Sequence, residues 1–194
     1  MSDLEAGFKA LQAKQSAYSR YWDLAATAKS LAKSDPDYTA GVRMMVRDGV
    51  YYITDVLADQ MGPMDTENLF LATSEQDALD AERRGLDYAV RWEIEPGSAG
   101  KREARRMVSA LSGMDAKGIP SRGDKVTRAK AFLAQAEAGN VLLVRGPWND
   151  RWLTHMHNQP NAPHDDIWDA TAGVFNALVG VKQGQKAKAE AWAW

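Results

Sequence analysis

Acidic side chains lie in three separate segments of the chain, and their types suit chemistry on phosphate. The first segment is Arg20-Tyr-Trp-Asp-Leu-Ala25, which contains Asp23. The second is the pair Glu93 and Glu95 before Pro96-Gly-Ser-Ala-Gly-Lys101, and the third is His164-Asp-Asp-Ile-Trp-Asp169. Carboxylate oxygens are preferred ligands of hard divalent cations, and two such ions can support phosphodiester hydrolysis. A fold that brought the three segments together would therefore build a metal-dependent nuclease site.

Each acidic segment also has a purely structural interpretation. Asp23 could face water at the end of a strand, and the two glutamates could belong to a solvated strand face. Asp165 and Asp166 could cap the first turn of a helix, where carboxylates are favoured. However, the third segment holds three acids in five residues, and Asp169 lies about one helical turn beyond the other two. Capping alone does not need so many acids, so this segment favours a ligand role most strongly.

The hydrophobic pattern predicts α/β architecture, a mixed β-sheet flanked by α-helices. Asp48-Gly49 is typical of a hairpin turn, so the first three strands should form an antiparallel meander before helices and strands alternate. The alternation from Tyr88 onward places Glu93 and Glu95 on one strand face, with Glu95 where the chain leaves the sheet. Strands are expected at 18–24, 39–47, 50–57, 88–95, 116–119 and 140–144. Helices are expected at 3–16, 64–84, 101–111, 125–138, 148–157 and 165–178. The pattern is compatible with a ribonuclease H-like fold but does not select it.

Length and composition set broad limits on function. A chain of 194 residues is about one domain, which we place at 18–180 between an N-terminal helix or linker (1–17) and a C-terminal tail (181–194). The formal charge of −2 argues against a strong, self-sufficient DNA binder. The absence of cysteine excludes disulfides and Cys-ligated zinc. No apolar run suits a membrane span or a signal peptide, so cytoplasm is the default compartment.

Other motifs support weaker interpretations. The run from Gly97 to Lys101 lacks the spacing and the following Ser or Thr of a P-loop. His155 and His157 have no companion ligands at zinc spacing, so surface positions suit them better. Basic side chains on predicted helices could meet phosphate, although ordinary solvated helix faces would look the same. The basic candidates are Lys101, Lys125 and Arg128.

An ordered set of motifs carries a resemblance to a known family. The motifs are Arg20-Tyr-Trp-Asp-Leu-Ala-Ala-Thr27, Asp37-Tyr-Thr-Ala-Gly41, Tyr51-Tyr-Ile-Thr-Asp-Val56, Glu95-Pro-Gly-Ser-Ala-Gly-Lys101, Lys125-Val-Thr-Arg128, Ala138-Gly-Asn-Val141, Trp148-Asn149 and His164-Asp-Asp-Ile-Trp-Asp-Ala170. Together they resemble the C-terminal nuclease domain of bacteriophage terminase large subunits, over about residues 18–180. Each motif is modest alone, but the order of the whole set is specific.

The resemblance implies a ribonuclease H-like endonuclease that cleaves concatemeric double-stranded DNA with two Mg²⁺ or Mn²⁺ ions. Carried onto this sequence, the principal catalytic and metal-binding acids are Asp23, Glu95 and Asp166. Lys125 and Arg128 match a basic feature of the family and would approach DNA. The alternative or assisting ligands are Glu93, Asp165 and Asp169.

The family also implies partners and a setting. These are a packaging ATPase domain or subunit, a small terminase subunit and the portal of the procapsid, in the host cytoplasm and without a membrane. This chain has no Walker motif, so we expect an excised nuclease domain, a separately encoded half or a remnant. Two alternatives stay open: another ribonuclease H-like nuclease of the junction-resolvase or RNase H type, and a catalytically silent packaging or assembly module.

Overall fold

A computed structural model describes residues 17–25, 35–121 and 123–191 of the chain. The strands are β1 (Ala17–Asp23), β2 (Thr39–Arg47), β3 (Val50–Asp59), β4 (Asp87–Ile94), β5 (Asp115–Pro120) and β6 (Val141–Leu143). The helices are α2 (Pro63–Arg84), α3 (Ser98–Ala110), α4 (Lys125–Glu137), α5 (Asn149–Asn158) and α6 (Asp166–Ala191). The predicted helix at 3–16 lies outside the described residues.

One six-stranded sheet organises the fold, in the order β5-β4-β1-β2-β3-β6. The strands β1, β2 and β3 pair antiparallel, whereas β4 pairs parallel with β1, β5 with β4, and β6 with β3. Asp48 and Gly49 both have positive φ, 51° and 84°, which is the conformation of a tight two-residue hairpin turn. The predicted antiparallel meander with added parallel strands is therefore confirmed.

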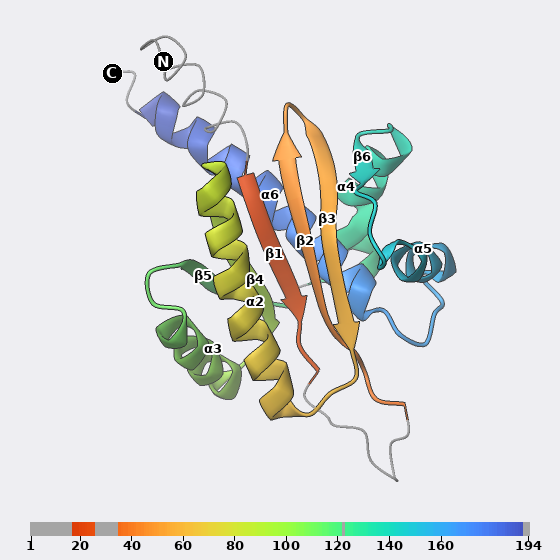
Figure 1. Ribbon diagram of the computed structural model, residues 1–194. Coiled ribbons are helices and arrows are strands. Elements are labelled where there is room, and N and C mark those ends of the chain that lie inside the picture. Colours follow the sequence, from red (N-terminus) through yellow and green to blue (C-terminus); the bar gives the residue numbers. More distant parts are fainter. Residues whose placement is uncertain (1–16, 26–34, 122, 192–194) are drawn as a thin grey trace.

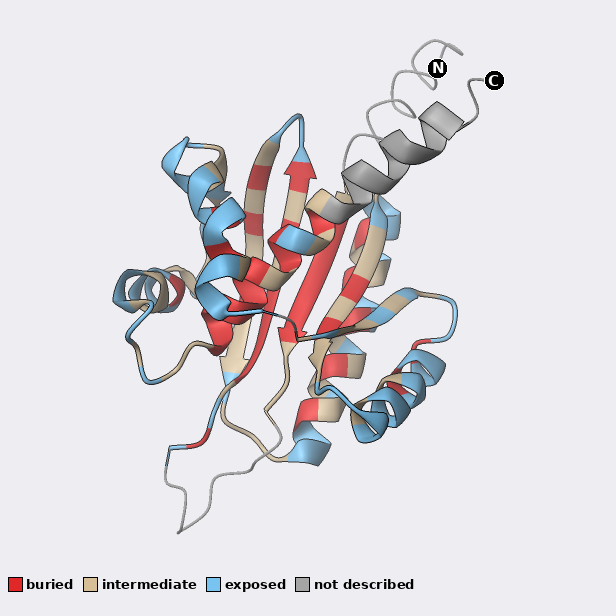
Figure 2. Cartoon of the chain, turned by 180° about the vertical axis from the view of Figure 1, so that it is seen from behind, coloured by how far each residue is buried: buried red, intermediate tan, exposed pale blue. Residues whose placement is uncertain are grey.

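Helices cover both faces of this sheet. In Figure 1, α2 crosses in front of β1 and β4, and α6 passes behind β1 and β2. Successive side chains of β1 point to opposite faces of the sheet. Tyr21 packs in the core beneath α6, and Trp22 packs in the core beneath α2. Gly41 on β2 makes the second arrangement possible, because a Cβ there would lie 2.6 Å from the Trp22 ring. Figure 2 shows the result from behind, with central strands largely buried and the outer faces of the helices exposed.

The structure differs from the sequence-based expectation at element ends. The last helix was expected to end near Leu178, but α6 continues to Ala191 through a stretch rich in Ala, Lys and Gln, which are strong helix formers. The helix expected from Lys101 begins at Ser98, directly after Gly97 with φ 114°. Within the described part of the chain, none of the helices combines the length and the apolar character that crossing a membrane requires.

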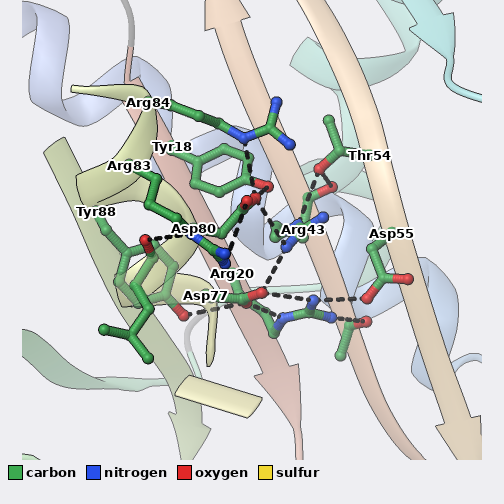
Figure 3. A network of polar contacts seen from close by, with 12 residues as sticks. Tyr18, Arg20, Arg43, Thr54, Asp55, Asp77, Asp80, Arg83, Arg84 and Tyr88 are labelled. Carbon is green, nitrogen blue, oxygen red and sulfur yellow. Dashed lines mark hydrogen bonds and ion pairs between the residues drawn. The ribbon is translucent and has the colours of Figure 1, made fainter. Parts of the chain in front are cut away.

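A buried ion-pair network fastens α2 to the sheet. The Arg20 side chain is only 1% exposed, and its Nε and Nη2 donate to Asp77 and Asp55, each at 2.6 Å. Its Nη1 donates to the Gly41 carbonyl at 3.0 Å. Asp77 also accepts from Arg43 at 2.6 Å (Figure 3). The network therefore joins β1, β2 and β3 to α2 and satisfies a charge that would otherwise be costly to bury.

Removal of Asp77 should destabilise the protein strongly, because it would leave Arg20 buried with half of its compensation lost. We expect Asp77→Ala to lower the free energy of unfolding by about 3–5 kcal/mol, measured by urea denaturation. The matched control is Arg106→Ala, which removes a surface ion pair with Glu67 and should cost less than about 1 kcal/mol. Equal stability losses in the two variants would contradict a clamping role for this network.

A candidate metal centre at the ends of β1 and β4

The central parallel strands bring two of the acidic segments together. Trp22 on β1 pairs in register with Trp92 on β4, so Asp23 and Glu93 are the next residues along adjacent strands. Neighbouring strands lie about 4.8 Å apart, and successive side chains alternate between faces. Because both tryptophans point into the α2 core, Asp23 and Glu93 point together toward the α6 side.

The third acidic segment reaches the same place because α6 lies close against β1. A Cβ on Gly173 would lie 2.5 Å from the Tyr21 ring, so the small residue lets the helix backbone contact the strand. The helix begins at Asp166, and the side chains of Asp166 and Asp169 are 9% and 2% exposed. Acids from β1, β4 and α6 therefore converge at the carboxyl ends of the central strands, with Asp166 and Asp169 buried and Asp23 and Glu93 half-buried.

The electrostatics of Asp23 report this convergence directly. Burial raises the pKa of its carboxyl group well above the ordinary value of 3.8, and repulsion from Asp166, Glu93 and Asp169 raises it further. The nearby ammonium group of Lys125 acts in the opposite direction. Desolvation and like charge both disfavour an ionised carboxylate. Asp23 is therefore in an environment that calls for additional positive charge.

The carboxyl group of Asp166 also lacks full compensation for its burial. Burial raises the pKa of its carboxyl group, although a backbone hydrogen bond from Tyr38 acts against the rise. Among the described residues, the buried Asp166 Oδ2 has no hydrogen-bond partner, and neither has the buried Nδ1 of His164, which is 3.9 Å away. The other His164 ring nitrogen lies 2.8 Å from Asp35. Two buried polar atoms thus lie close together without a direct bond.

Two cations from α4 balance part of the acidic cluster. Arg128 bonds Glu93 at 2.6 Å and Asp169 at 3.1 Å. Lys125 lies 3.0 Å from Asp169 and also pairs with Asp165. These pairs raise the pKa of both cations, although burial acts in the opposite direction. Asp169 is consequently the best-neutralised acid of the cluster. Neither Lys125 nor Arg128 bonds Asp23 or Asp166, so the negative charge of those two carboxylates is less well compensated.

The structure separates the sequence-predicted candidates into two groups. Asp23, Asp166, Asp169 and the alternative ligand Glu93 face one another, with Asp165, Lys125 and Arg128 at their border. Glu95 follows the last residue of β4, is exposed, and lines a hollow of about 500 Å³ between α3 and the start of α2. Lys101 is exposed on α3, a helix that packs on β4 and β5. Glu93 therefore lies nearer to the Asp23 group than Glu95 does.

The sequence did not predict the contacts that hold the acidic cluster together. It did not foresee that Arg128 would bond acids from two elements, or that His164 would approach Asp166. One signal in the sequence favoured Glu93: Pro96 ends the strand, so strand alternation holds for Glu93 but not for Glu95, which lies next to the break. Across the described residues, the acidic and histidine side chains as placed do not form a group of three that would enclose a metal ion.

Comparisons with known proteins bear on this arrangement. A family profile described as "Terminase RNaseH-like domain" matches residues 20–178. A structure of the human cytomegalovirus terminase nuclease domain is similar to this chain with a TM-score of 0.58 and 14% identity, over 84% of each chain. A manganese-soaked, inhibitor-bound structure of that domain has a TM-score of 0.57 and 11% identity, covering 92% of this chain and 95% of the other. No curated protein gives a significant sequence match.

The family match and the structural likeness agree on one architecture. The matched region begins at Arg20 on β1 and ends at Leu178 on α6, so it includes all three acidic segments. The structural matches have too little identity to carry more than the fold, which is ribonuclease H-like. The family profile spans most of the 194 residues. The chain belongs to the terminase family, as its ribonuclease H-like nuclease domain.

Proposed function

We propose that this domain is a divalent-metal-dependent endodeoxyribonuclease that cleaves concatemeric double-stranded DNA during viral DNA packaging. The observation that carries the proposal is the convergence of half-buried carboxylates from β1 and β4 with buried carboxylates from α6. Such a group is unfavourable by itself and becomes favourable when it shares cations. The manganese-soaked terminase nuclease structure is a further support.

The residues present fit Mg²⁺ or Mn²⁺. All the candidate ligands are carboxylate oxygens, the donor type that these hard cations prefer. Asp23 and Asp166 would be the principal ligands, because repulsion burdens the first and the second has a buried, unpartnered oxygen. Glu93 or Glu95 would complete the set from the β4 end. Two bound ions would activate a water and stabilise the charge that develops on the phosphate.

The chain's own cations would prepare this chemistry. Lys125 and Arg128 bond Asp169 from two sides, which holds the first turn of α6 against the ends of the strands. Arg128 also orients Glu93. Both cations border the acids, so they can approach the DNA phosphates as well. The burial of Asp166 and the partial burial of Asp23 limit competition from bulk water for the carboxylate oxygens.

The wider setting follows the family. We propose double-stranded DNA as the substrate, and a packaging ATPase, a small terminase subunit and the portal as partners in the host cytoplasm. With a formal charge of −2, the domain has little long-range attraction for DNA. Delivery of DNA by a partner is consistent with that charge.

A catalytically silent packaging module is the second candidate. One observation favours it: α4 cations already bond Glu93 and Asp169, and the described acids do not form a ready group of three around a metal ion. In a silent module these ion pairs would be the final state. Metal binding separates the two functions, because only a nuclease needs the acids to exchange these partners for Mg²⁺ or Mn²⁺.

The purified protein should nick and linearise plasmid DNA with Mn²⁺, and less efficiently with Mg²⁺. Asp23→Ala and Asp166→Ala should each lower the cleavage rate at least about 100-fold, since even partners of metal ligands often contribute that much. Asp150→Ala, an exposed acid on α5, is the matched control and should cut like the parent. Mn²⁺ should also raise the melting temperature of the parent but not of Asp23→Asn. Variants that all cut like the parent would refute the assignment.

Asp23→Asn should stabilise the metal-free protein at pH 7. The pKa of Asp23 is raised in the native state, so between 3.8 and that raised pKa the native state binds more protons than the unfolded state. Stability of the parent therefore falls as pH rises through this window. We expect a higher urea midpoint for Asp23→Asn at pH 7, and a shrinking difference as the pH approaches 3.8. A lower midpoint at pH 7 would show that Asp23 is not under repulsion.

A comparison of two amide variants should identify the ligand near β4. Because Glu93 is close to Asp23 and Glu95 lines the neighbouring hollow, we expect Glu93→Gln to lower Mn²⁺-dependent cleavage by about 10–100-fold. Glu95→Gln should have the smaller effect. The measurement is the cleavage rate over a Mn²⁺ titration, which separates weaker metal binding from a lower maximal rate. The reverse order would assign Glu95, as the family motif implies.

A further inference from the structure

A second hollow lies beside the acidic cluster, on the α6 side of the sheet. It has a volume of about 500 Å³ and is enclosed by β1, β4, β5, α6 and the neighbourhood of Arg128 on α4. Three of its lining side chains are cationic, Arg91, Lys117 and Arg128. We call it the basic hollow. Small residues of α6, including Ala172 and Gly173, form its wall and leave the space open.

Strand register places the basic hollow directly behind the acids. Tyr21 pairs with Arg91, and Arg91 with Lys117, so these residues form one row across β1, β4 and β5. Asp23 and Glu93 belong to the next row on the same face, two residues further along. Two residues of strand correspond to about 6.6 Å. A molecule extending from the acids into the hollow would therefore reach the cations within about 6.6 Å.

The cations of the hollow have capacity for an anion. Lys117 is exposed, and no ion pair ties it to another residue in the described part of the chain. Arg91 is 11% exposed and donates to the Asp115 carboxylate at 2.7 Å and to the backbone carbonyls of Val90 and Asp115 at 3.0 and 2.6 Å, so it adds positive charge to the hollow while its own hydrogen bonds stay within the protein. The buried Nε of Arg128 has no hydrogen-bond partner among the described residues. The single acid that lines the hollow, Asp169, is already bonded by Lys125 and Arg128.

The hollow on the other side of β4 has the opposite character. Glu93 also borders this hollow, but its carboxylate turns to Arg128 on the α6 side. The other acids of the lining are Glu67, Glu95 and Glu103, against one cation, Arg106. That cation bonds both Glu67 and Glu103. A polyanion that reaches the acids is therefore repelled from this side and attracted on the side of Arg91 and Lys117.

We propose that the basic hollow binds a backbone phosphate of the DNA strand that is cut, about one or two nucleotides from the phosphate at the acids. The spacing follows from the row separation of about 6.6 Å and an axial rise of about 3.4 Å per nucleotide. Lys117 contacts this phosphate directly, and Arg91 on the adjacent strand adds positive charge beside it. The contact reads no base and fixes the register of the strand. This inference rests on the proposed nuclease function for its substrate.

The salt dependence of DNA binding tests this contact without any need for cleavage. The protein carries Asp23→Asn, EDTA is present, and the probe is a fluorescein-labelled 20-base-pair duplex followed by anisotropy. One lost phosphate contact should lower the slope of log K against log salt by about 0.9 and weaken binding roughly three- to eight-fold at 0.1 M KCl. We expect these changes for Lys117→Ala, with most of the affinity restored in Lys117→Arg.

Lys130→Ala is the matched control, because Lys130 is an exposed lysine on α4 that does not line the hollow. It should retain the parental affinity and slope. Equal affinity and slope in Lys117→Ala and Lys130→Ala would overturn the proposal, and so would a parent that binds no duplex at 0.1 M KCl. Because metal and cleavage are absent, failure of the nuclease assay does not alter this readout.

The sequence allows a positional test as well, since it contains no cysteine. A single Lys117→Cys substitution can form a disulfide with a duplex that carries a thiol tether on one defined phosphate. We expect the highest yield when the tether lies within about two nucleotides of the mapped cut, and little yield from Lys130→Cys. Equal yields from both cysteines at every tether position would overturn the proposal.

Discussion

Repulsion among buried carboxylates is the constraint on which the rest of this structure depends. Asp23 has its pKa raised by burial and then by three neighbouring acids, so the ionised cluster opposes folding. Lys125 and Arg128 relieve part of that repulsion by bonding Asp169. The docking of α4 on α6 therefore does more than bury apolar surface, because it brings positive charge to the place where the fold has concentrated negative charge.

The two faces of the sheet use buried charge in contrasting ways. On the α2 side, Arg20 is fully buried and its guanidinium is bonded by Asp55 and Asp77. That network is internally complete, as a structural network has to be. On the α6 side, Asp166 keeps a buried oxygen without a partner among the described residues. This unpartnered oxygen at the start of α6 is the feature that the proposed divalent cation would satisfy.

Sequence patterns predicted the scaffold better than the site. Alternation and the Asp48-Gly49 turn were sufficient for the meander, and the acids Asp23 and Asp166 were selected correctly as neighbours of one another. The position of Glu95 was harder, because Glu95 follows the last residue of β4, where strand alternation no longer sets the direction of a side chain. The bonds made by Arg128 could not be predicted, since they depend on how α4 docks. The length of α6 was underestimated because residues 181–194 were interpreted as a C-terminal tail.

Under the proposed function, the distribution of charge around the acids would let an acidic domain bind DNA locally. A net charge of −2 gives weak attraction at long range, where salt screens individual charges beyond about 10 Å. At contact distance the local arrangement decides instead, and the two hollows that flank β4 differ in sign. A strand arriving over β5 meets Lys117 and Arg91 before it meets the acids, whereas a strand arriving over α3 meets glutamates first. In the proposed nuclease, the fold would therefore favour entry of a phosphate backbone over β5, where Lys117 and Arg91 form no ion pair with the candidate metal-binding acids among the described residues.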